Sequence, residues 1–298
     1  MDNTLFILGN GFDLGLGFKT SYGDFMKSKE FFDFRESTYL GEYLYKEQNK
    51  NKTWIDIEKE LSKYCLEINS GGLMNPMKTN GPGLLQAEYG TLKDTLKKYL
   101  ERETVRYVTI DSSSNALALL NQVGLGNNNR IVTFNYTELV EGITGNVFSP
   151  QNHNLLHVHG SLATEDDIVF GVEDEVKLPK KHAFLYKAYS MFKQTRTFSK
   201  WLSEASNIVF YGYSLGDTDK QYFARYFQDL CKINDFNRKI VFYHYGIGAY
   251  NDLKWQLLSF TGSQLSALEM YNDVQFLDCS MKGHLPVTIY FSILPAKK

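Results

Sequence analysis

Short apolar runs alternate with amphipathic stretches along most of this chain. Apolar runs of about four to eight residues are typical of strands buried on both faces, and helical spacing between them is typical of crossovers that join parallel strands. The runs that predict strands are residues 5–8, 130–134, 154–159, 167–170, 207–211, 239–245 and 274–277, with a candidate edge strand at 288–294. The stretches that predict helices include residues 22–34, 115–123, 186–202, 220–230 and 251–259. We therefore predict an α/β fold with a doubly wound, mostly parallel, Rossmann-like sheet.

Residues 37 to about 110 interrupt this alternation, because no convincing buried strand occurs there. Apolar residues at helical spacing instead form two stripes, which are Trp54, Ile57, Leu61, Cys65 and Ile68, and then Leu85, Tyr89, Leu92, Leu96, Tyr99 and Leu100. We predict one domain, residues 1–298, with a helical insertion at about 37–110. Glu58 follows Trp54 by one turn and could point into a cleft, although a solvated helix glutamate is the favoured interpretation.

The first predicted strand ends in Gly9-Asn10-Gly11-Phe12-Asp13. Glycine lets the backbone approach a pyrophosphate closely, and the helix that follows presents unpaired N–H groups and a positive dipole end. A nucleotide site is the first hypothesis, and a tight strand-to-helix turn without a ligand is the alternative. The dinucleotide fingerprint requires a third glycine where this chain has Leu14, and the acids about 20 residues further on lie in helical sequence. An ordinary dehydrogenase is therefore not expected.

Three other predicted strands also end in polar or glycine-rich sequence. Asn135 follows residues 130–134, and His159 with Gly160 closes residues 154–159. Residues 207–211 are followed by the loop Gly212-Tyr213-Ser214-Leu215-Gly216-Asp217-Thr218-Asp219. Ligands of open parallel sheets bind beyond the carboxyl ends of the strands, at the switch point. We predict that the four strand exits meet around one nucleotide-sized cavity.

Composition and charge narrow the function classes. Lys and Arg number 32 against 34 Asp and Glu, so nucleic-acid binding is not expected by default. The apolar run near the N-terminus is too short for a signal peptide or a membrane span, which indicates a cytoplasmic protein. The three cysteines are far apart and lack C-x-x-C spacing, which argues against a disulfide framework and a zinc ribbon. We expect buried free thiols and no metal.

The four exits together resemble the bacterial abortive-infection family AbiH, whose members guard against phage, and more distantly the sirtuin-like NAD-binding fold. The matching sequences are Leu8-Gly9-Asn10-Gly11-Phe12-Asp13-Leu14, Thr20-Ser21-Tyr22, Trp54 with Glu58, Phe134-Asn135-Tyr136-Thr137, Val158-His159-Gly160 and Gly212-Tyr213-Ser214-Leu215-Gly216-Asp217. The resemblance implies that Gly9 and Gly11 hold a pyrophosphate and that Asn135 and His159 serve the nicotinamide ribose. It also implies that Gly212 and Ser214 lie near the adenosine ribose, with Asn10 and Phe12 in the same nucleotide-binding loop as Gly9.

The chain departs from the sirtuin-like deacylases in two ways. It has no four-cysteine zinc module, and it reads Phe18-Lys19-Thr20-Ser21-Tyr22 where those enzymes have Pro-Asp-Phe-Arg. The resemblance then implies the antiphage branch, whose members cleave NAD itself and starve the infected cell. The expected partners are NAD as substrate, a phage trigger or defence protein, and further copies of the chain in a homo-oligomer.

Cleavage of NAD needs a fixed ribose, a stabilised oxocarbenium-like cation and a placed water. We expect Asn135 to position water and a ribose hydroxyl, and His159 to accept a proton, because the ordinary pKa of histidine lies near neutral pH. Asp13 would place an anion near the developing cation, and Asp217 would bind ribose hydroxyls. Structural alternatives stay open: Asn135 capping the next turn, Asp13 capping its helix, and either Asp217 or Asp219 acting as a cap.

His157 and His159 share one face of a strand, but no acid or cysteine partner has metal-ligand spacing, so His157 is expected to be structural. Two other function classes remain. A nucleotide-binding sensor would bind NAD without turnover and act through a partner protein. A nuclease would require metal-binding carboxylates and a basic cleft, and the sequence provides no such cluster.

Overall fold

The computed structural model describes residues 3–50, 56–70, 82–105, 110–124, 126, 128–163, 168–189, 194–232 and 237–285. Two predictions lie outside the described residues, namely the inward position of Trp54 and the candidate edge strand at 288–294. Of the helices within the described part of the chain, none is both long and apolar enough to cross a membrane.

Six parallel strands form one sheet in the described residues, in the order β3-β2-β1-β4-β5-β6. The strands are β1 (Thr4–Leu8), β2 (Arg130–Thr133), β3 (Leu155–His157), β4 (Asn207–Tyr211), β5 (Lys239–His244) and β6 (Asp273–Asp278). The chain moves outward from β1 to β3 in one direction and from β4 to β6 in the other, so the switch point lies between β1 and β4. The predicted doubly wound, parallel α/β fold is confirmed.

The register of the strands aligns their carboxyl ends. Leu8 pairs with both Thr133 and Tyr211, and Thr133 pairs in turn with His157. Because all of these strands are parallel, the residues directly after β1, β2, β3 and β4 leave the sheet at the same edge.

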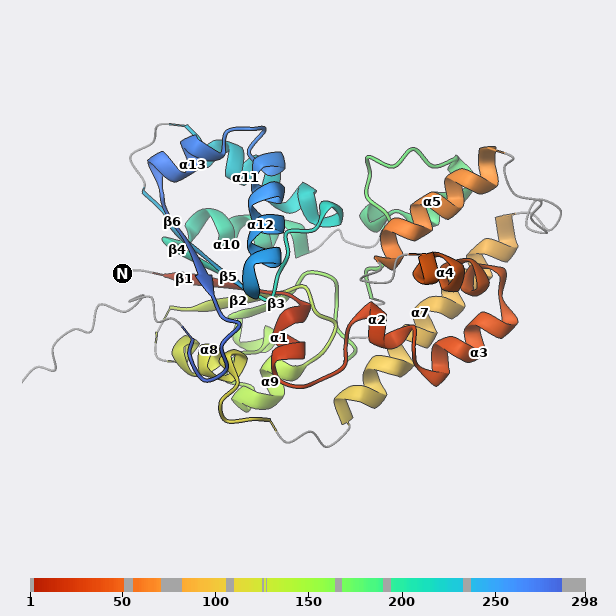
Figure 1. Cartoon of the computed structure of the whole chain (residues 1–298), viewed down its shortest axis with the longest axis horizontal. Helices are drawn as coiled ribbons and strands as arrows, with labels where there is room; N and C mark the ends of the chain where they lie inside the picture. The colour runs from red at the N-terminus through yellow and green to blue at the C-terminus, as the bar shows by residue number, and fades with distance from the viewer. Residues whose placement is uncertain are drawn as a thin grey trace, which may run out of the picture.

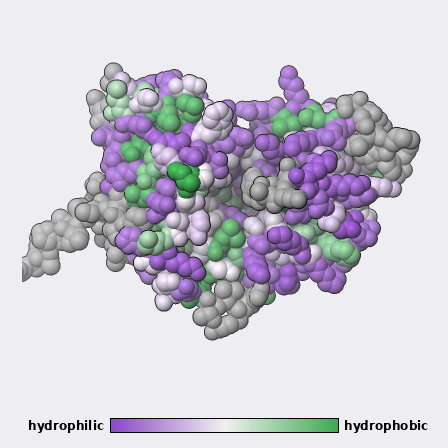
Figure 2. Space-filling model, in the orientation of Figure 1, coloured by the Kyte–Doolittle hydropathy of each residue, from purple (hydrophilic) through white to green (hydrophobic). Residues whose placement is uncertain are grey.

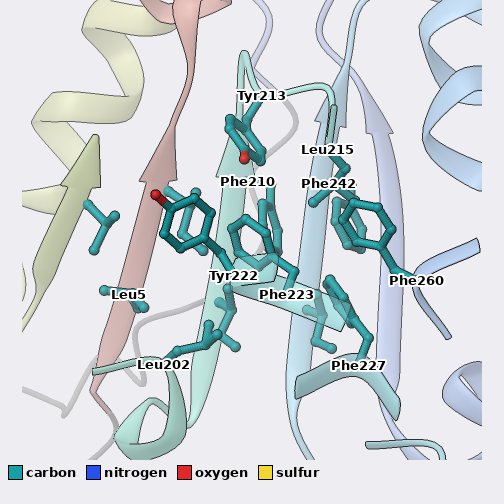
Figure 3. Packing of buried hydrophobic residues seen from close by; sticks show 14 of the residues in the cluster. Leu5, Leu202, Phe210, Tyr213, Leu215, Tyr222, Phe223, Phe227, Phe242 and Phe260 are labelled. Atoms are coloured by element: carbon teal, nitrogen blue, oxygen red, sulfur yellow. The ribbon is translucent and has the colours of Figure 1, made fainter. Parts of the chain in front are cut away.

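Alternate strand residues fill two apolar layers, one on each face of the sheet. Ile7 and Phe210 belong to the first layer, and Phe6 and Val209 belong to the second. Figure 3 shows the first layer, in which the ring of Phe223 lies over Phe210 with centroids 5.7 Å apart. Burial of both faces explains why the strands read as continuous apolar runs rather than as alternating ones.

Helices cover both faces of the sheet (Figure 1). One face carries α1 (Asn10–Gly15), α8 (Asn115–Val123) and α9 (Leu139–Thr144), and the other carries α10 (Gln194–Glu204), α11 (Lys220–Leu230), α12 (Gly246–Phe260) and α13 (Leu265–Tyr271). The helix predicted at 186–202 is instead a short turn, η3 (Lys187–Tyr189), followed by α10. The strand predicted at 167–170 is wrong for residues 168–170, which are buried but irregular.

The helical insertion stands to one side of the sheet (Figure 1). It contains α2 (Tyr22–Phe25), α3 (Lys29–Ser37), α4 (Tyr39–Lys50), α5 (Ile57–Ser70) and α7 (Pro82–Val105). Phe25, Phe31 and Phe34, which precede the predicted start at about residue 37, pack into the same apolar core as the helices of the insertion. In Figure 2 the surface over this lobe is mostly hydrophilic where residues are described. The two apolar stripes predicted for the helices of this insertion are confirmed at Ile57 and Leu92, whose side chains are both fully buried.

Candidate functional site

The exits of β1 and β4 are in direct backbone contact. The N–H of Gly11 donates to the Gly212 carbonyl at 2.9 Å, and the N–H of Gly9 donates to the Tyr211 carbonyl at 3.1 Å. A Cβ atom on Gly9 would lie 2.6 Å from the Gly212 oxygen, and one on Gly11 would lie 2.6 Å from the Gly212 Cα atom. Gly212 itself has a φ of +62°. The close approach of the two loops therefore explains these three glycines independently of any ligand.

The other residues assigned to the nucleotide-binding loops differ in accessibility. The Phe12 side chain is fully buried and packs edge-on against Tyr211, and the Phe12 N–H donates to the Gly9 carbonyl at 2.9 Å. Asn10 is half-buried, and its side-chain oxygen accepts a hydrogen bond from Thr20 at 2.7 Å. Ser214 and Asp217 are exposed at the rim of the β4 exit.

Asp13 and Asn135 meet between the exits of β1 and β2. The Asn135 Nδ2 atom donates to Asp13 Oδ1 at 2.6 Å and to the Gly9 carbonyl at 3.1 Å. The Thr137 hydroxyl donates to the second Asp13 oxygen at 2.7 Å. Both groups that face the Asn135 Nδ2 atom are oxygen acceptors. If the amide were flipped, its own oxygen would face these two oxygens, so the hydrogen bonds fix the orientation of the Asn135 amide. This leaves the Asn135 Oδ1 atom as the group that can accept from a ligand.

Burial raises the pKa of Asp13 to about 7, although hydrogen bonds from Thr137, Asn135 and Thr20 act in the opposite direction. The side chain is 1% exposed, and its hydrogen-bonding partners are neutral groups. Asp13 is not the N-cap of α1, because Gly9 holds that position. Asp13 is thus a carboxyl group that titrates near neutral pH within a polar, buried network.

His157 contacts the backbone of Asn135. Its Nδ1 atom lies 3.1 Å from the Asn135 carbonyl, and its Nε2 atom lies 2.9 Å from Glu141 of α9. The ring is 4% exposed. These two contacts give His157 a clear structural task, which is to tie the β2 exit to α9.

His159 lies at the same sheet edge, among aromatic rings. The Phe134 centroid is 5.2 Å from its ring, with Tyr136 and Tyr222 slightly further away, and His159 is 6% exposed. Its Nε2 atom is buried and lies 3.4 Å from Oδ1 of Asp219, the last residue of the turn η4 (Asp217–Asp219). Of the two aspartates in this loop, Asp219 therefore contacts the histidine, and Asp217 points to solvent.

A buried lysine that the sequence analysis did not identify stands beside this pair. The Lys187 Nζ atom lies 2.9 Å from Glu58, 3.0 Å from Glu173 and 3.8 Å from Asp219, and it donates to the Thr218 carbonyl at 3.2 Å. Its side chain is 0% exposed. A buried ammonium is tolerated because these carboxylates compensate its charge.

Glu58 belongs to this cluster, so its favoured interpretation as a solvated helix glutamate is wrong. It is 5% exposed, and its other oxygen accepts from the N–H of Gly171 at 3.1 Å. Burial raises the pKa of Glu58, against the opposing charge of Lys187. Because Glu58 comes from α5, the helical insertion contributes a charge to the edge of the sheet.

The remaining carboxyls of the cluster differ in pKa. Burial raises the pKa of Glu173 to about 7, with the charge of Lys187 acting against it. Burial also acts to raise the pKa of Asp219, but the Lys187 charge and the contacts with His159 and Tyr213 outweigh it, so this pKa lies below its ordinary value. Among the described residues, no group of three or more His, Cys, Asp or Glu side chains is arranged to hold a metal ion.

Sequence reasoning found Asp13, Asn135, His159 and the two glycine loops, and it missed Lys187 and Glu173. The missed residues lie in the irregular segment 168–189, which has no period to indicate which side chains face inward.

Comparison with known protein families identifies a matching family. The model of a family described as "Bacteriophage abortive infection AbiH" matches residues 5–244, well over half of the chain. No curated protein matches the sequence. The matched range contains all four strand exits and the whole Lys187 cluster.

Proposed function

The chain belongs to the bacteriophage abortive infection AbiH family, and from this premise we propose that it is an antiphage effector that hydrolyses NAD to nicotinamide and ADP-ribose. One observation carries the proposal: the exits of β1, β2, β3 and β4 leave the same edge of the sheet. This edge includes the β1–β4 switch point, where doubly wound sheets of this strand order bind dinucleotides. A role in abortive infection follows from the family, and the reaction and its residues are the proposal.

The reaction breaks the bond between C1′ of the nicotinamide ribose and the nicotinamide nitrogen. The bonding electrons leave with nicotinamide, which departs as a neutral molecule, and the ribose becomes an oxocarbenium-like cation. Water then adds to C1′ and loses one proton. The protein has to hold the ribose, stabilise the cation and accept this proton.

We assign these tasks to three side chains. Asn135 offers Oδ1 to a ribose hydroxyl or to the attacking water, because both of its N–H groups are already used. His159 accepts the proton of that water through its imidazole. Asp13, with a pKa of about 7, provides partial negative charge directly behind Asn135.

The dinucleotide itself would extend along the β1 and β4 loops. Gly11 and Gly212 are partly exposed there despite their mutual contact, and Asn10, Ser214 and Asp217 carry accessible polar side chains. Gly9 and Phe12 contribute only backbone in this arrangement. We further propose that the protein acts in the cytoplasm as a homo-oligomer, in response to a phage component or a defence partner.

The test is release of nicotinamide and ADP-ribose from NAD by the purified protein, separated and quantified by liquid chromatography. The wild type should form both products in equal amounts, and His159→Ala and Asn135→Ala should abolish them. His153→Ala and Asn251→Ala are matched controls, because both residues are exposed and lie outside the site.

Calorimetry with NAD and with ADP-ribose separates the proposal from a nucleotide sensor. Tight binding without nicotinamide release after overnight incubation would replace the hydrolase with a sensor that acts through a partner. Toxicity in cells that disappears on mutation while the NAD level never changes would also contradict hydrolysis.

A further inference from the structure

The His159–Asp219 contact divides the roles of the two imidazole nitrogens. The Nε2 atom is buried and faces Asp219 Oδ1 at 3.4 Å. The two atoms are within ion-pair distance but do not meet hydrogen-bond geometry, and such contacts often tighten when substrate binds. A carboxylate opposite Nε2 favours the tautomer that carries its hydrogen on Nε2. The lone pair of Nδ1 is then the one that can take a proton from water.

Asp219 is itself held from two sides. The Tyr213 hydroxyl donates to Oδ2 at 2.7 Å, and Lys187 lies 3.8 Å from Oδ1. The aspartate is 8% exposed, so these contacts replace most of its hydration. With the Lys187 charge beside it, Asp219 remains an anion in a site where an isolated carboxyl would take up a proton.

Lys187 is in turn fixed by residues from distant parts of the chain. Glu58 lies on α5 of the insertion, Glu173 lies in the irregular segment after β3, and the Thr218 carbonyl lies in the β4 exit. The lysine therefore joins the insertion to the loop that carries Asp219. A bulkier or uncharged side chain at position 187 could not make the same set of contacts.

We propose that Asp219 is a positioning residue for His159, and that Lys187, clamped by Glu58, holds Asp219 in place for this task. The inference rests on the proposed hydrolysis of NAD. When Nδ1 accepts the proton of the attacking water, the ring becomes an imidazolium, and Asp219 stabilises that charge through the Nε2–H group. The proton later leaves Nδ1 for solvent, which restores the neutral ring. A carboxylate that orients and stabilises a catalytic histidine in this way is known from hydrolase triads.

The first measurement is kinetic. Asp219→Asn keeps the size of the side chain and removes its charge, so it should lower kcat for NAD by about 10²- to 10⁴-fold. The KM should change by no more than about twofold, because Asp219 does not touch the dinucleotide in this arrangement. The control is Asp229→Asn on the exposed side of α11, where the carboxylate pairs with Lys232 at the surface.

The second measurement reports on the ring directly. Two-bond ¹H–¹⁵N correlation spectra of histidine-labelled protein distinguish the two neutral tautomers, and the spectrum of His159→Ala assigns the signal. The wild type should show His159 with its hydrogen on Nε2, and Asp219→Asn should lose that preference. A matched loss of tautomer preference and of kcat supports the positioning role.

The outcomes separate this inference from the proposed function. Wild-type kcat together with an unchanged tautomer in Asp219→Asn would overturn the positioning role while leaving hydrolysis intact. A lowered kcat with an unchanged tautomer would also overturn it. Hydrolysis would be rejected if the wild type never released nicotinamide. If Asp219→Asn still changed the His159 tautomer in that case, the control of the His159 ring by Asp219 would be retained.

Discussion

Two aspartates at the same edge of the sheet behave in opposite ways. Asp13 is 1% exposed and Asp219 is 8% exposed, so both have lost nearly all their water. The pKa of Asp13 is raised to about 7 by burial, whereas that of Asp219 lies below its ordinary value because the Lys187 charge and the contacts with His159 and Tyr213 together outweigh burial. Neutral donors from Asn135 and Thr137 only moderate the cost of burying a carboxylate. The pKa of a buried carboxyl stays low where a cation, a histidine and a hydroxyl all face it, as at Asp219, whereas the Lys187 cation alone leaves the pKa of Glu173 at about 7.

The comparison assigns different tasks to the two sites. An acid with a pKa near 7 changes charge under small changes in its surroundings, including the arrival of a positively charged ring such as the nicotinamide of the proposed substrate. An acid fixed as an anion is suited to hold a histidine ring in one orientation. The proposed hydrolysis uses both kinds: Asp13 behind Asn135, and Asp219 behind His159.

The largest expected effect comes from removal of the cation. Lys187→Met leaves Glu58, Glu173 and Asp219 buried without compensation, so it should destabilise the fold by about 3–5 kcal/mol. Urea unfolding at pH 7, followed by circular dichroism, measures this change. Lys200→Met is the control, since Lys200 is exposed and pairs with Glu204 at the surface. A loss below about 1 kcal/mol would mean that the carboxyls are protonated even in the wild type.

Removal of Asp13 tests the other side of the comparison. The folded-state pKa of about 7 exceeds the ordinary 3.8, so the folded protein holds this proton more tightly than the unfolded chain. The resulting stability is fully present below about pH 4 and disappears as the pH rises through 7, which makes the wild type about 2–3 kcal/mol more stable at pH 5 than at pH 8 from this group. Asp13→Asn should reduce the measured difference between pH 5 and pH 8 by that amount in urea unfolding, and other buried acids such as Glu173, whose pKa is also about 7, account for the remainder.

Asp33→Asn is the matched control for Asp13→Asn, because Asp33 is exposed and pairs with Lys29. It should keep the pH dependence of the wild type. If Asp13→Asn also keeps it, then Asp13 is ionised at pH 5, and the contrast with Asp219 fails.

The two sites also differ in how far sequence could predict them. The six strands and the positions of Asp13, Asn135 and His159 follow from buried apolar runs that end in polar residues. The Lys187 cluster could not be found this way, because a buried lysine is tolerated only when several distant carboxylates surround it. Glu58 and Lys187 are 129 positions apart (187 − 58), on a helix and in a short turn. The local sequence around Glu58 or around Lys187 does not indicate that the two side chains form an ion pair.

Other misjudged features have the same origin. Residues 22–34 have a helical period, but a period does not specify against which core a helix packs, and the structure places Phe25, Phe31 and Phe34 in the core of the insertion. Residues 168–170 are apolar and buried, yet they lie beside the loop after β3 rather than in the sheet, with the N–H of Val169 donating to the His159 carbonyl. Burial alone does not define a strand.

The smallest expected effects on stability come from removing one hydroxyl donor from each aspartate. Thr137→Val removes a donor to Asp13 and should cost about 2 kcal/mol at pH 8 but only about 1 kcal/mol at pH 5, where Asp13 is largely protonated and needs the donor less. Tyr213→Phe removes the donor to Asp219 and should cost about 2 kcal/mol at both pH values, because that carboxylate is charged throughout this range. Urea unfolding of both variants at the two pH values measures the contrast. Equal pH dependence in both would show that the lysine does not distinguish the two acids.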